Sequence, residues 1–199
     1  VSSSCGVDGI NSKFLISTKV YSAIILTNIF QQSLHTSCIP EDWKVGKVIP
    51  LHKSGDRHSP YNYRPISLTC ISCKVMEHVI CSHLASFLQS NSFFTDHQYG
   101  FRKSFSCETQ LLTFTHDLNS ILDRGSIVDC IFLDFSKAFD KVSHQLLLLK
   151  LSKLNIDPNV LQWLHSFLTD RSQFVTVNNI SSITSAVESG MPQGSVLGP

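Results

Sequence analysis

The sequence predicts an α+β fold, and three observations carry that prediction. Segments with helical and with strand-like apolar patterns follow one another without the regular alternation that a doubly wound parallel sheet requires. The run IVDCIFLDF at 127–135 is nearly continuous in apolar residues and follows Gly125, which is typical of a strand covered on both faces. The chain has 199 residues, 42% of them hydrophobic, so it can bury the core of one domain.

Apolar spacing and end signals place each element. Apolar residues recur at helical spacing after Asn11 and Ser12, either of which can cap the helix, and Ile39-Pro40 is expected to end it. Asp157 followed by Pro158 is a typical helix start. The predicted elements are, in order, a helix at 11–35, extended segments at 44–53 and 61–68 around a turn at 54–56, helices at 71–89 and 106–123, a strand at 127–135, helices at 143–155 and 157–169, a hairpin of 172–177 and 180–187 around Asn178-Asn179, and a Gly-punctuated loop from Gly190 to Pro199.

The cysteine usage indicates the cellular compartment, whereas the charge balance indicates no particular partner. Lys and Arg number 16 against 15 Asp and Glu, and the charged fraction is only 16%. The chain shows no signal peptide and no apolar run of the ~18 residues that span a bilayer. Its start, Val1-Ser2-Ser3-Ser4, predicts a chain truncated at that end. The 7 cysteines are odd in number and lie mostly in apolar patterns, so we expect reduced thiols in an intracellular compartment, the nucleus or the cytoplasm.

Acidic and basic residues near predicted strand ends are the first candidates for chemistry. Asp134 closes the predicted strand, where a carboxylate can hold a divalent metal that binds phosphate, although Asp134 or Asp140 can equally cap the next helix. Lys53 and Arg64 flank the predicted hairpin turn, where they can grip a polyphosphate or form part of a solvated basic surface.

The loop before the helix at 106–123 carries a polar and aromatic cluster. Its members are Gln98, Gly100, Phe101 and Arg102. Such a cluster can lie against a nucleic-acid strand by stacking and phosphate contact. An ordinary surface loop explains the same residues equally well.

A possible zinc site is disfavoured by spacing. Cys70 and Cys73 precede His78 and His83 within one continuous helical pattern. Zinc sites usually gather their ligands from two separated loops, so core packing is the better interpretation of the two cysteines.

Six sequence blocks, taken in order, resemble the reverse transcriptases of non-LTR (LINE-like) retrotransposons. The order and spacing of the blocks carry the resemblance, which covers nearly the whole chain. NYRPIS and KAFD are the most characteristic parts, and group II intron and retron enzymes fit less well. The blocks are VDGI at 7–10, WKVGKVIPLHKSGD at 43–56, YNYRPISL at 61–68, QYGFRKSFSCETQL at 98–111, FLDFSKAFDKVSH at 132–144 and GMPQGSVLGP at 190–199.

The resemblance implies a right-hand polymerase fold and a two-metal reaction. Residues 1–123 would form the fingers and 124–199 the N-terminal half of the palm. Asp134 matches the catalytic, metal-binding aspartate, and the Phe135 backbone carbonyl is expected to be a second ligand. In the family, two Mg²⁺ or Mn²⁺ ions assist attack of the primer 3′-hydroxyl on the α-phosphate of a dNTP.

The resemblance also implies substrate contacts and partners. Phe139 matches the bulky residue that excludes a 2′-hydroxyl, which favours dNTPs over rNTPs. The expected partners are an RNA template, a DNA primer or target, and dNTPs, with no membrane. The dNTP contacts would come from Lys53, Arg64, Phe135, Phe139, Gln193 and Gly194, and the template contacts from Gln98, Gly100, Phe101 and Arg102.

One family motif does not occur in the 199 residues. The aromatic-Ala-Asp-Asp hairpin, which supplies the remaining metal carboxylates, and the thumb would follow the GMPQGSVLGP block. We therefore expect a chain truncated before both, unable to polymerise DNA alone, and prone to aggregate through an uncovered strand edge. The alternatives are a decayed element that at most binds RNA, or an α+β domain in which Asp134 only caps a helix.

Overall fold

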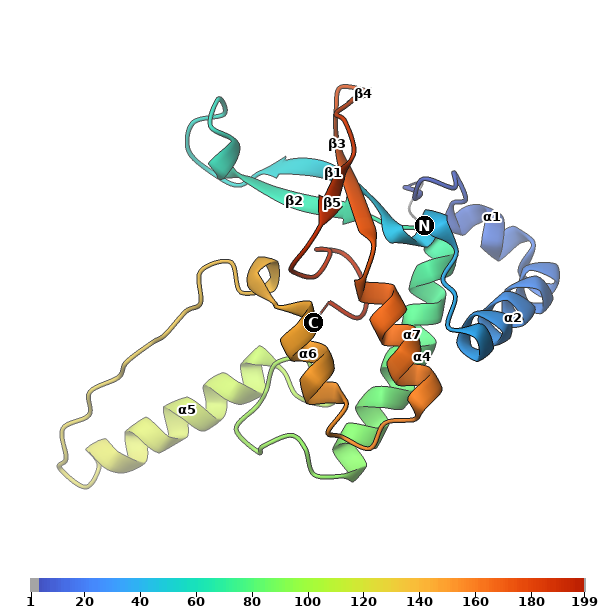
Figure 1. The fold of residues 1–199 in the computed structure, drawn as a ribbon. Helices are drawn as coiled ribbons and strands as arrows, with labels where there is room; N and C mark the ends of the chain where they lie inside the picture. The colour runs from blue at the N-terminus through green and yellow to red at the C-terminus, as the bar shows by residue number, and fades with distance from the viewer. Residues whose placement is uncertain (1–3, 199) are drawn as a thin grey trace. The chain divides into compact units, whose positions relative to one another are not determined.

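The computed structural model describes residues 4–198, which divide into two compact units (Figure 1). Unit 1 comprises the chain up to Ser82 together with Lys137–Gly198, and unit 2 comprises His83–Ser136. Val1–Ser3, on which the expectation of a truncated start rests, and Pro199 lie outside the described residues. These two units are defined by contacts within the chain. The division into fingers at 1–123 and palm at 124–199 refers instead to subdomains of a polymerase, and it stays a prediction.

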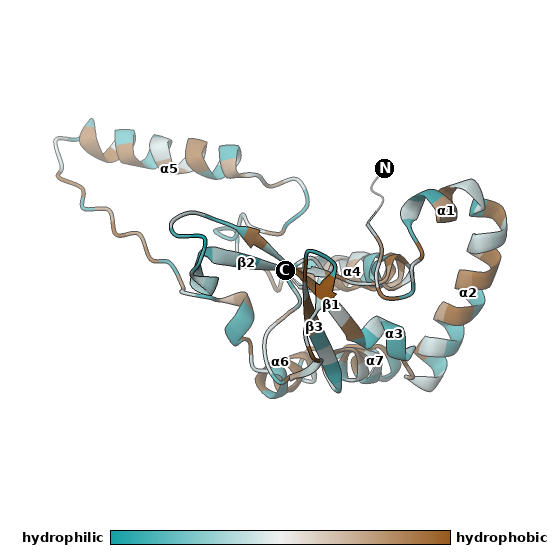
Figure 2. Ribbon diagram, turned by 90° about the horizontal axis from the view of Figure 1, so that it is seen from above, coloured by the Kyte–Doolittle hydropathy of each residue, from teal (hydrophilic) through white to brown (hydrophobic). Residues whose placement is uncertain are grey.

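Two helices open unit 1. They are α1 (Ser12–Ser17) and α2 (Lys19–Thr36), and the predicted Asn11 cap is confirmed because its side chain accepts a hydrogen bond from the Phe14 amide. The pair ends before Ile39-Pro40, because Ser37 adopts a left-handed conformation with φ 55°. Most of the apolar side chains that predicted the helix are exposed, and the apolar stretches of α2 are visible in Figure 2.

The predicted hairpin at 44–68 is confirmed. A short helix that the sequence analysis missed, α3 (Glu41–Lys44), leads into β1 (Val45–His52). The chain returns through a 3₁₀ turn, η1 (Pro60–Asn62), into β2 (Tyr63–Leu68). The two strands pair antiparallel, from Lys47 opposite Leu68 to His52 opposite Tyr63.

The C-terminal hairpin joins the same sheet. It comprises β3 (Arg171–Val177), β4 (Ile180–Ser181) and β5 (Ser185–Val187), and β3 pairs parallel with β1. Asn178 and Asn179 have φ of 50° and 64°, which confirms the predicted positive-φ turn. The strand order is β2-β1-β3-β4, with β5 also paired to β3, so the structure is α+β with a mixed sheet.

The core of unit 1 forms around two helices. These are the first part of α4 (Ile71–Ser90) and α7 (Pro158–Leu168), the latter capped by Asp157 as predicted. Trp163 stacks on Phe167 with a centroid distance of 5.4 Å and donates its indole N–H to Ser33 Oγ of α2 at 2.9 Å. Cys70 and Cys73 are buried in the same core, in agreement with the packing interpretation. The helix that precedes α7 is α6 (His144–Leu151), which ends four residues before its predicted end at 155.

Unit 2 contains α5 (Cys107–Leu122) and a long irregular segment. Ser106 and Thr109 cap α5 reciprocally, and the predicted helix is confirmed. The predicted strand at 127–135 is wrong, because the structure shows no strand there and Leu133 is 89% exposed. A strand requires a hydrogen-bonded neighbour, and no strand among residues 4–198 pairs with this segment. Among all the helices of residues 4–198, none is both long enough and apolar enough to cross a bilayer.

Candidate functional site

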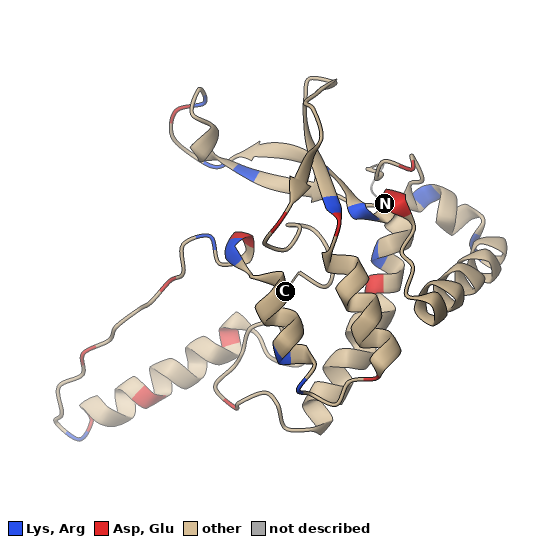
Figure 3. Cartoon of the chain, viewed as in Figure 1, with Lys and Arg blue, Asp and Glu red and all other residues tan. Residues whose placement is uncertain are grey.

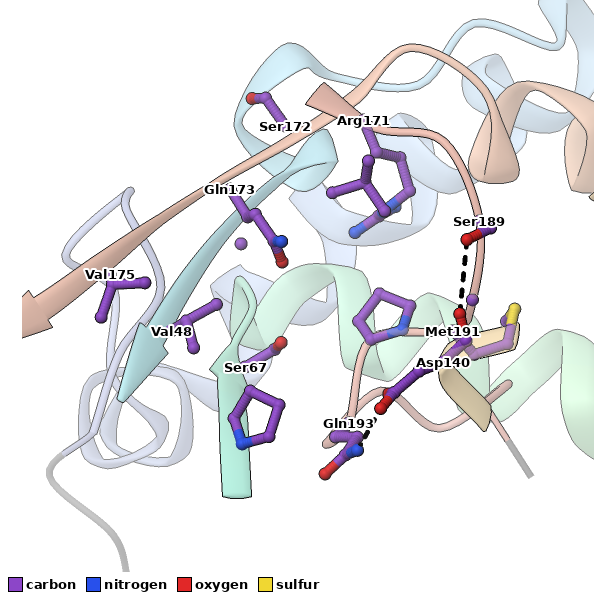
Figure 4. A pocket seen from close by; sticks show the side chains of 15 residues that line it. Val48, Ser67, Asp140, Arg171, Ser172, Gln173, Val175, Ser189, Met191 and Gln193 are labelled. Carbon is purple, nitrogen blue, oxygen red and sulfur yellow. Dashed lines mark hydrogen bonds between the residues drawn. The ribbon is translucent and has the colours of Figure 1, made fainter. Parts of the chain in front are cut away.

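A cavity of ≈ 320 Å³ lies in unit 1, between the sheet and the loop that follows β5 (Figure 4). β1, β2 and β3 form one wall, and residues 189–193 together with Asp140 form the other. The labelled side chains include Ser67 and Arg171 on the sheet and Asp140 and Gln193 on the opposite wall, where Ser189 donates its hydroxyl to the Asp140 carbonyl at 3.3 Å.

Backbone hydrogen bonds join two segments about fifty residues apart. One segment is the 3₁₀ turn η2 (Phe139–Lys141), and the other is the loop at 189–195. The Met191 amide donates to the Phe139 carbonyl at 2.9 Å, and the Gly190 amide donates to the Val142 carbonyl at 2.9 Å. These bonds bring the KAFD block and the Pro-Gln-Gly block together.

Gln193 is held from two sides. Its side-chain Nε2 donates to Asp140 Oδ1 at 3.1 Å, and its backbone carbonyl accepts the Ser67 amide at 2.8 Å. β2 is the edge strand of the sheet, so the loop occupies that edge at Ser67. The orientation of the Gln193 side chain therefore depends on a carboxylate of the KAFD block.

Two glycines allow the loop to approach its neighbours closely. A Cβ on Gly190 would lie 2.7 Å from the Asp140 carbonyl oxygen, and one on Gly194 would lie 2.8 Å from the Ser67 carbonyl oxygen. Both glycines also have positive φ, 81° and 116°. No other residue fits these two positions without strain.

The hairpin places Lys53 and Arg64 on one face. Arg64 lies opposite Leu51, and Lys53 lies two residues beyond Leu51, so the strand alternation gives both the same side. Both are exposed, and basic residues recur along this hairpin (Figure 3). Pro65 and Ser67, which line the cavity, alternate to the other face. Of the expected dNTP-contacting residues, Gln193 lines the cavity, and Phe139 and Gly194 lie in the two segments that meet beside it. Lys53 and Arg64 do not line it.

Asp134 and Phe135 belong to unit 2. Both are exposed, and Phe135 is 83% accessible. Within residues 4–198, no group of three or more His, Cys, Asp or Glu side chains could hold a metal ion. One carboxylate and one carbonyl are too few ligands for a hard divalent cation, so the described residues do not by themselves fit the implied metal pair.

The candidate template residues form an internally bonded loop in unit 2. Arg102 donates to the carbonyls of Thr95 at 2.7 Å and Gln98 at 3.3 Å, and its guanidinium lies 4.1 Å from the centroid of the Phe105 ring. Phe101 is 72% exposed. The Arg102 side chain therefore stabilises the loop through contacts within it, whereas the Phe101 ring faces solvent.

Sequence reasoning missed three residues of this region. It considered Asp140 only as a helix cap, and it did not consider Glu77 or Arg171, which are both buried. Burial lowers the pKa of Arg171, and the Cys73 and Glu77 side chains oppose that shift. One signal for Glu77 was available, because it occupies the buried face of α4 at helical spacing from Cys73 and Ile80.

Comparison with known proteins defines the class. Residues 51–199 match the family described as reverse transcriptase (RNA-dependent DNA polymerase), so the chain belongs to that family. The resemblance drawn from the six sequence blocks is thereby confirmed.

Similar proteins come from transposons of Drosophila melanogaster, which agrees with the non-LTR assignment. The "Probable RNA-directed DNA polymerase from transposon BS" is 34% identical over 98% of this chain and 21% of its own length. The corresponding protein of transposon X-element is 32% identical over 88% of this chain and 19% of its own. The "RNA-directed DNA polymerase from mobile element jockey" is 32% identical over 87% and 19%. The chain therefore spans about a fifth of these relatives.

Proposed function

We propose that this chain contributes the nucleotide-addition site of an RNA-directed DNA polymerase that copies a retrotransposon. The single observation that carries the proposal is the hydrogen-bonded junction between η2 and the Pro192-Gln193-Gly194 turn. In the family that junction lies beside the incoming dNTP. The expected fold is a right-hand polymerase, with fingers at 1–123 and palm at 124–199.

Each predicted site residue has a specific role in this proposal. Phe139 lies under the sugar and excludes a 2′-hydroxyl, because a repulsive contact discriminates against rNTPs without any bond to dNTPs. Gln193 and the backbone at Gly194 contact the nucleotide. Lys53 and Arg64 bind the triphosphate by charge-assisted hydrogen bonds, which requires the nucleotide to reach the hairpin face that carries them.

The remaining roles concern the primer, the template and the metal. Asp134 and the Phe135 carbonyl are the proposed ligands for Mg²⁺ or Mn²⁺, which would supply charge neutralisation at the phosphates, and the other ligands are not among residues 4–198. The loop at 98–102 contacts the RNA template, with Phe101 stacking on a base. The DNA primer or target supplies the 3′-hydroxyl.

Primer extension on an RNA template tests the function. The chain is expressed within the open reading frame that encodes it, and the same experiment uses the 199 residues alone. We expect extension from the longer protein, its loss in Asp134→Ala, and no extension from the 199 residues. Asp129→Ala is the matched control, because Asp129 is an exposed aspartate of the same segment.

Three results would contradict the proposal. They are extension that survives Asp134→Ala, equal loss in Asp129→Ala, and a coding sequence that, continued past Pro199, is interrupted by stop codons or lacks an aromatic-Ala-Asp-Asp motif. The last result would favour a decayed element that at most binds RNA.

A further inference from the structure

Glu77 is a buried carboxylate that the roles above do not use. It lies on α4, and its side chain is 0% exposed. A carboxylate removed from water is strongly unfavourable unless hydrogen bonds compensate for the lost hydration. Both Glu77 oxygens have partners, which shows what the carboxylate does in the fold.

The main partners are two successive amides of the C-terminal loop. Glu77 Oε2 accepts the Val196 amide at 2.7 Å and the Leu197 amide at 3.0 Å. Glu77 Oε1 accepts the Cys73 thiol at 3.5 Å. Hydrogen bonds to a carboxylate are about twice as strong as neutral ones, so these two bonds hold the loop firmly against α4.

The position of these amides connects Glu77 to Gln193. Val196 and Leu197 follow Gln193 by three and four residues, and the Ser195 amide closes a turn onto the Pro192 carbonyl at 3.0 Å. Asp140 and Ser67 hold Gln193 itself. The loop at 192–197 is therefore anchored at Gln193 and again just beyond it.

We propose that Glu77 is a positioning residue for nucleotide addition, which holds the loop at 192–197 so that Gln193 and Gly194 stay where the incoming dNTP binds. This inference rests on the proposed function. Glu77 touches no substrate and acts through the two backbone amides. A carboxylate suits this role better than an amide, because one Gln oxygen accepts more weakly and the Gln NH₂ would need a buried acceptor of its own.

Hydrogen exchange tests the anchor without any catalysis. In the 199-residue chain, Glu77→Gln should speed exchange of the Val196 and Leu197 amides by about 10-fold or more, as expected when hydrogen bonds to a charged group are weakened. Glu41→Gln is the matched control, because Glu41 is exposed on α3 of the same unit, and it should leave the loop unchanged. Unchanged exchange in Glu77→Gln would overturn the proposal.

Steady-state kinetics test the role in nucleotide addition. Within the encoding open reading frame, Glu77→Gln should raise KM for the dNTP about 10-fold while leaving affinity for the template–primer near the wild-type value. Glu77→Asp, which keeps the charge, should recover part of the loss. A merely structural residue would instead lower the amount of active protein and leave KM unchanged, and that result would overturn the proposal.

The two proposals fail in different ways. If the wild-type protein extends no primer, the proposed function fails and the role of Glu77 in nucleotide addition fails with it, whatever the exchange data show. If extension depends on Asp134 but Glu77→Gln changes neither exchange nor KM, only the inference about Glu77 fails.

Discussion

At the scale of single residues, Gly194 shows how closely the loop fits the sheet. Any side chain there meets the Ser67 carbonyl oxygen at 2.8 Å, at a φ of 116°. We expect Gly194→Ala to lower the free energy of unfolding by about 1–3 kcal/mol, because both the contact and the backbone conformation are unfavourable. Urea denaturation measures the change. Gly100→Ala is the control, since a Cβ there has no atom within 4 Å, and an equal loss in both variants would contradict the argument.

Buried thiols give a second prediction at this scale. Burial raises the pKa of Cys70 from its usual 9.0 to about 11, and it raises the pKa of Cys73 further. Since the thiolate is the reactive form, both should resist alkylation at pH 8 in the folded chain, while the exposed Cys38, Cys107 and Cys130 react. Mass spectrometry of the alkylated peptides decides between these outcomes.

The same shift makes stability depend on pH. In the unfolded chain the Cys70 thiol ionises near its usual pKa of 9.0, whereas in the folded chain it ionises only near 11. The buried, protonated Cys70 thiol therefore makes its full contribution to the free energy of unfolding below about pH 9. That contribution is lost as the pH rises through the pKa of about 11 that the thiol has in the folded chain. Urea denaturation at pH 8 and pH 10 should show the loss. A higher stability at pH 10 would contradict the assignment.

At the scale of elements, helix caps are the local feature most open to test. The Asp157 side chain accepts the amides of Asn159 at 2.8 Å and Val160 at 3.3 Å, at the start of a helix that carries the core residue Trp163. We expect Asp157→Ala to cost about 1 kcal/mol in urea denaturation. Asp123→Ala is the control, because Asp123 lies at the C-terminal end of α5, where a negative charge is unfavourable and its loss should cost nothing.

At the scale of the whole molecule, the segment at 127–135 exposes apolar side chains to solvent. Ile131, Phe132 and Leu133 are 83%, 81% and 89% exposed, on a backbone with no strand partner among residues 4–198. We expect the 199-residue chain to self-associate. We also expect proteases to cleave this segment at a higher rate than the β1–β2 hairpin. Light scattering and limited proteolysis measure both effects. Leu133→Ser should reduce association, whereas Val142→Ser, outside the segment, should not. A monomeric chain that resists cleavage at 127–135 would contradict the prediction.

The elements that the sequence predicted well have local causes. The Asn11 and Asp157 caps, the Asn178-Asn179 turn and the hairpin at 44–68 depend on residues close together in the chain. The strand at 127–135 was predicted wrongly for the opposite reason. Its apolar pattern favours a buried, extended conformation. A strand forms, however, only when a neighbouring segment supplies the backbone hydrogen bonds.

By itself, the sequence determined the family, the α+β class and the residues that the family motifs single out. The motifs are contiguous blocks, so their order along the chain is enough to identify them. Only the tertiary structure decided that Asp140 orients Gln193, that Glu77 holds the loop beyond it, and that Lys53 and Arg64 face away from the cavity. The Glu77 and Asp140 contacts join residues 53 or more positions apart, and local spacing cannot specify them because they depend on which surfaces pack together when the chain folds.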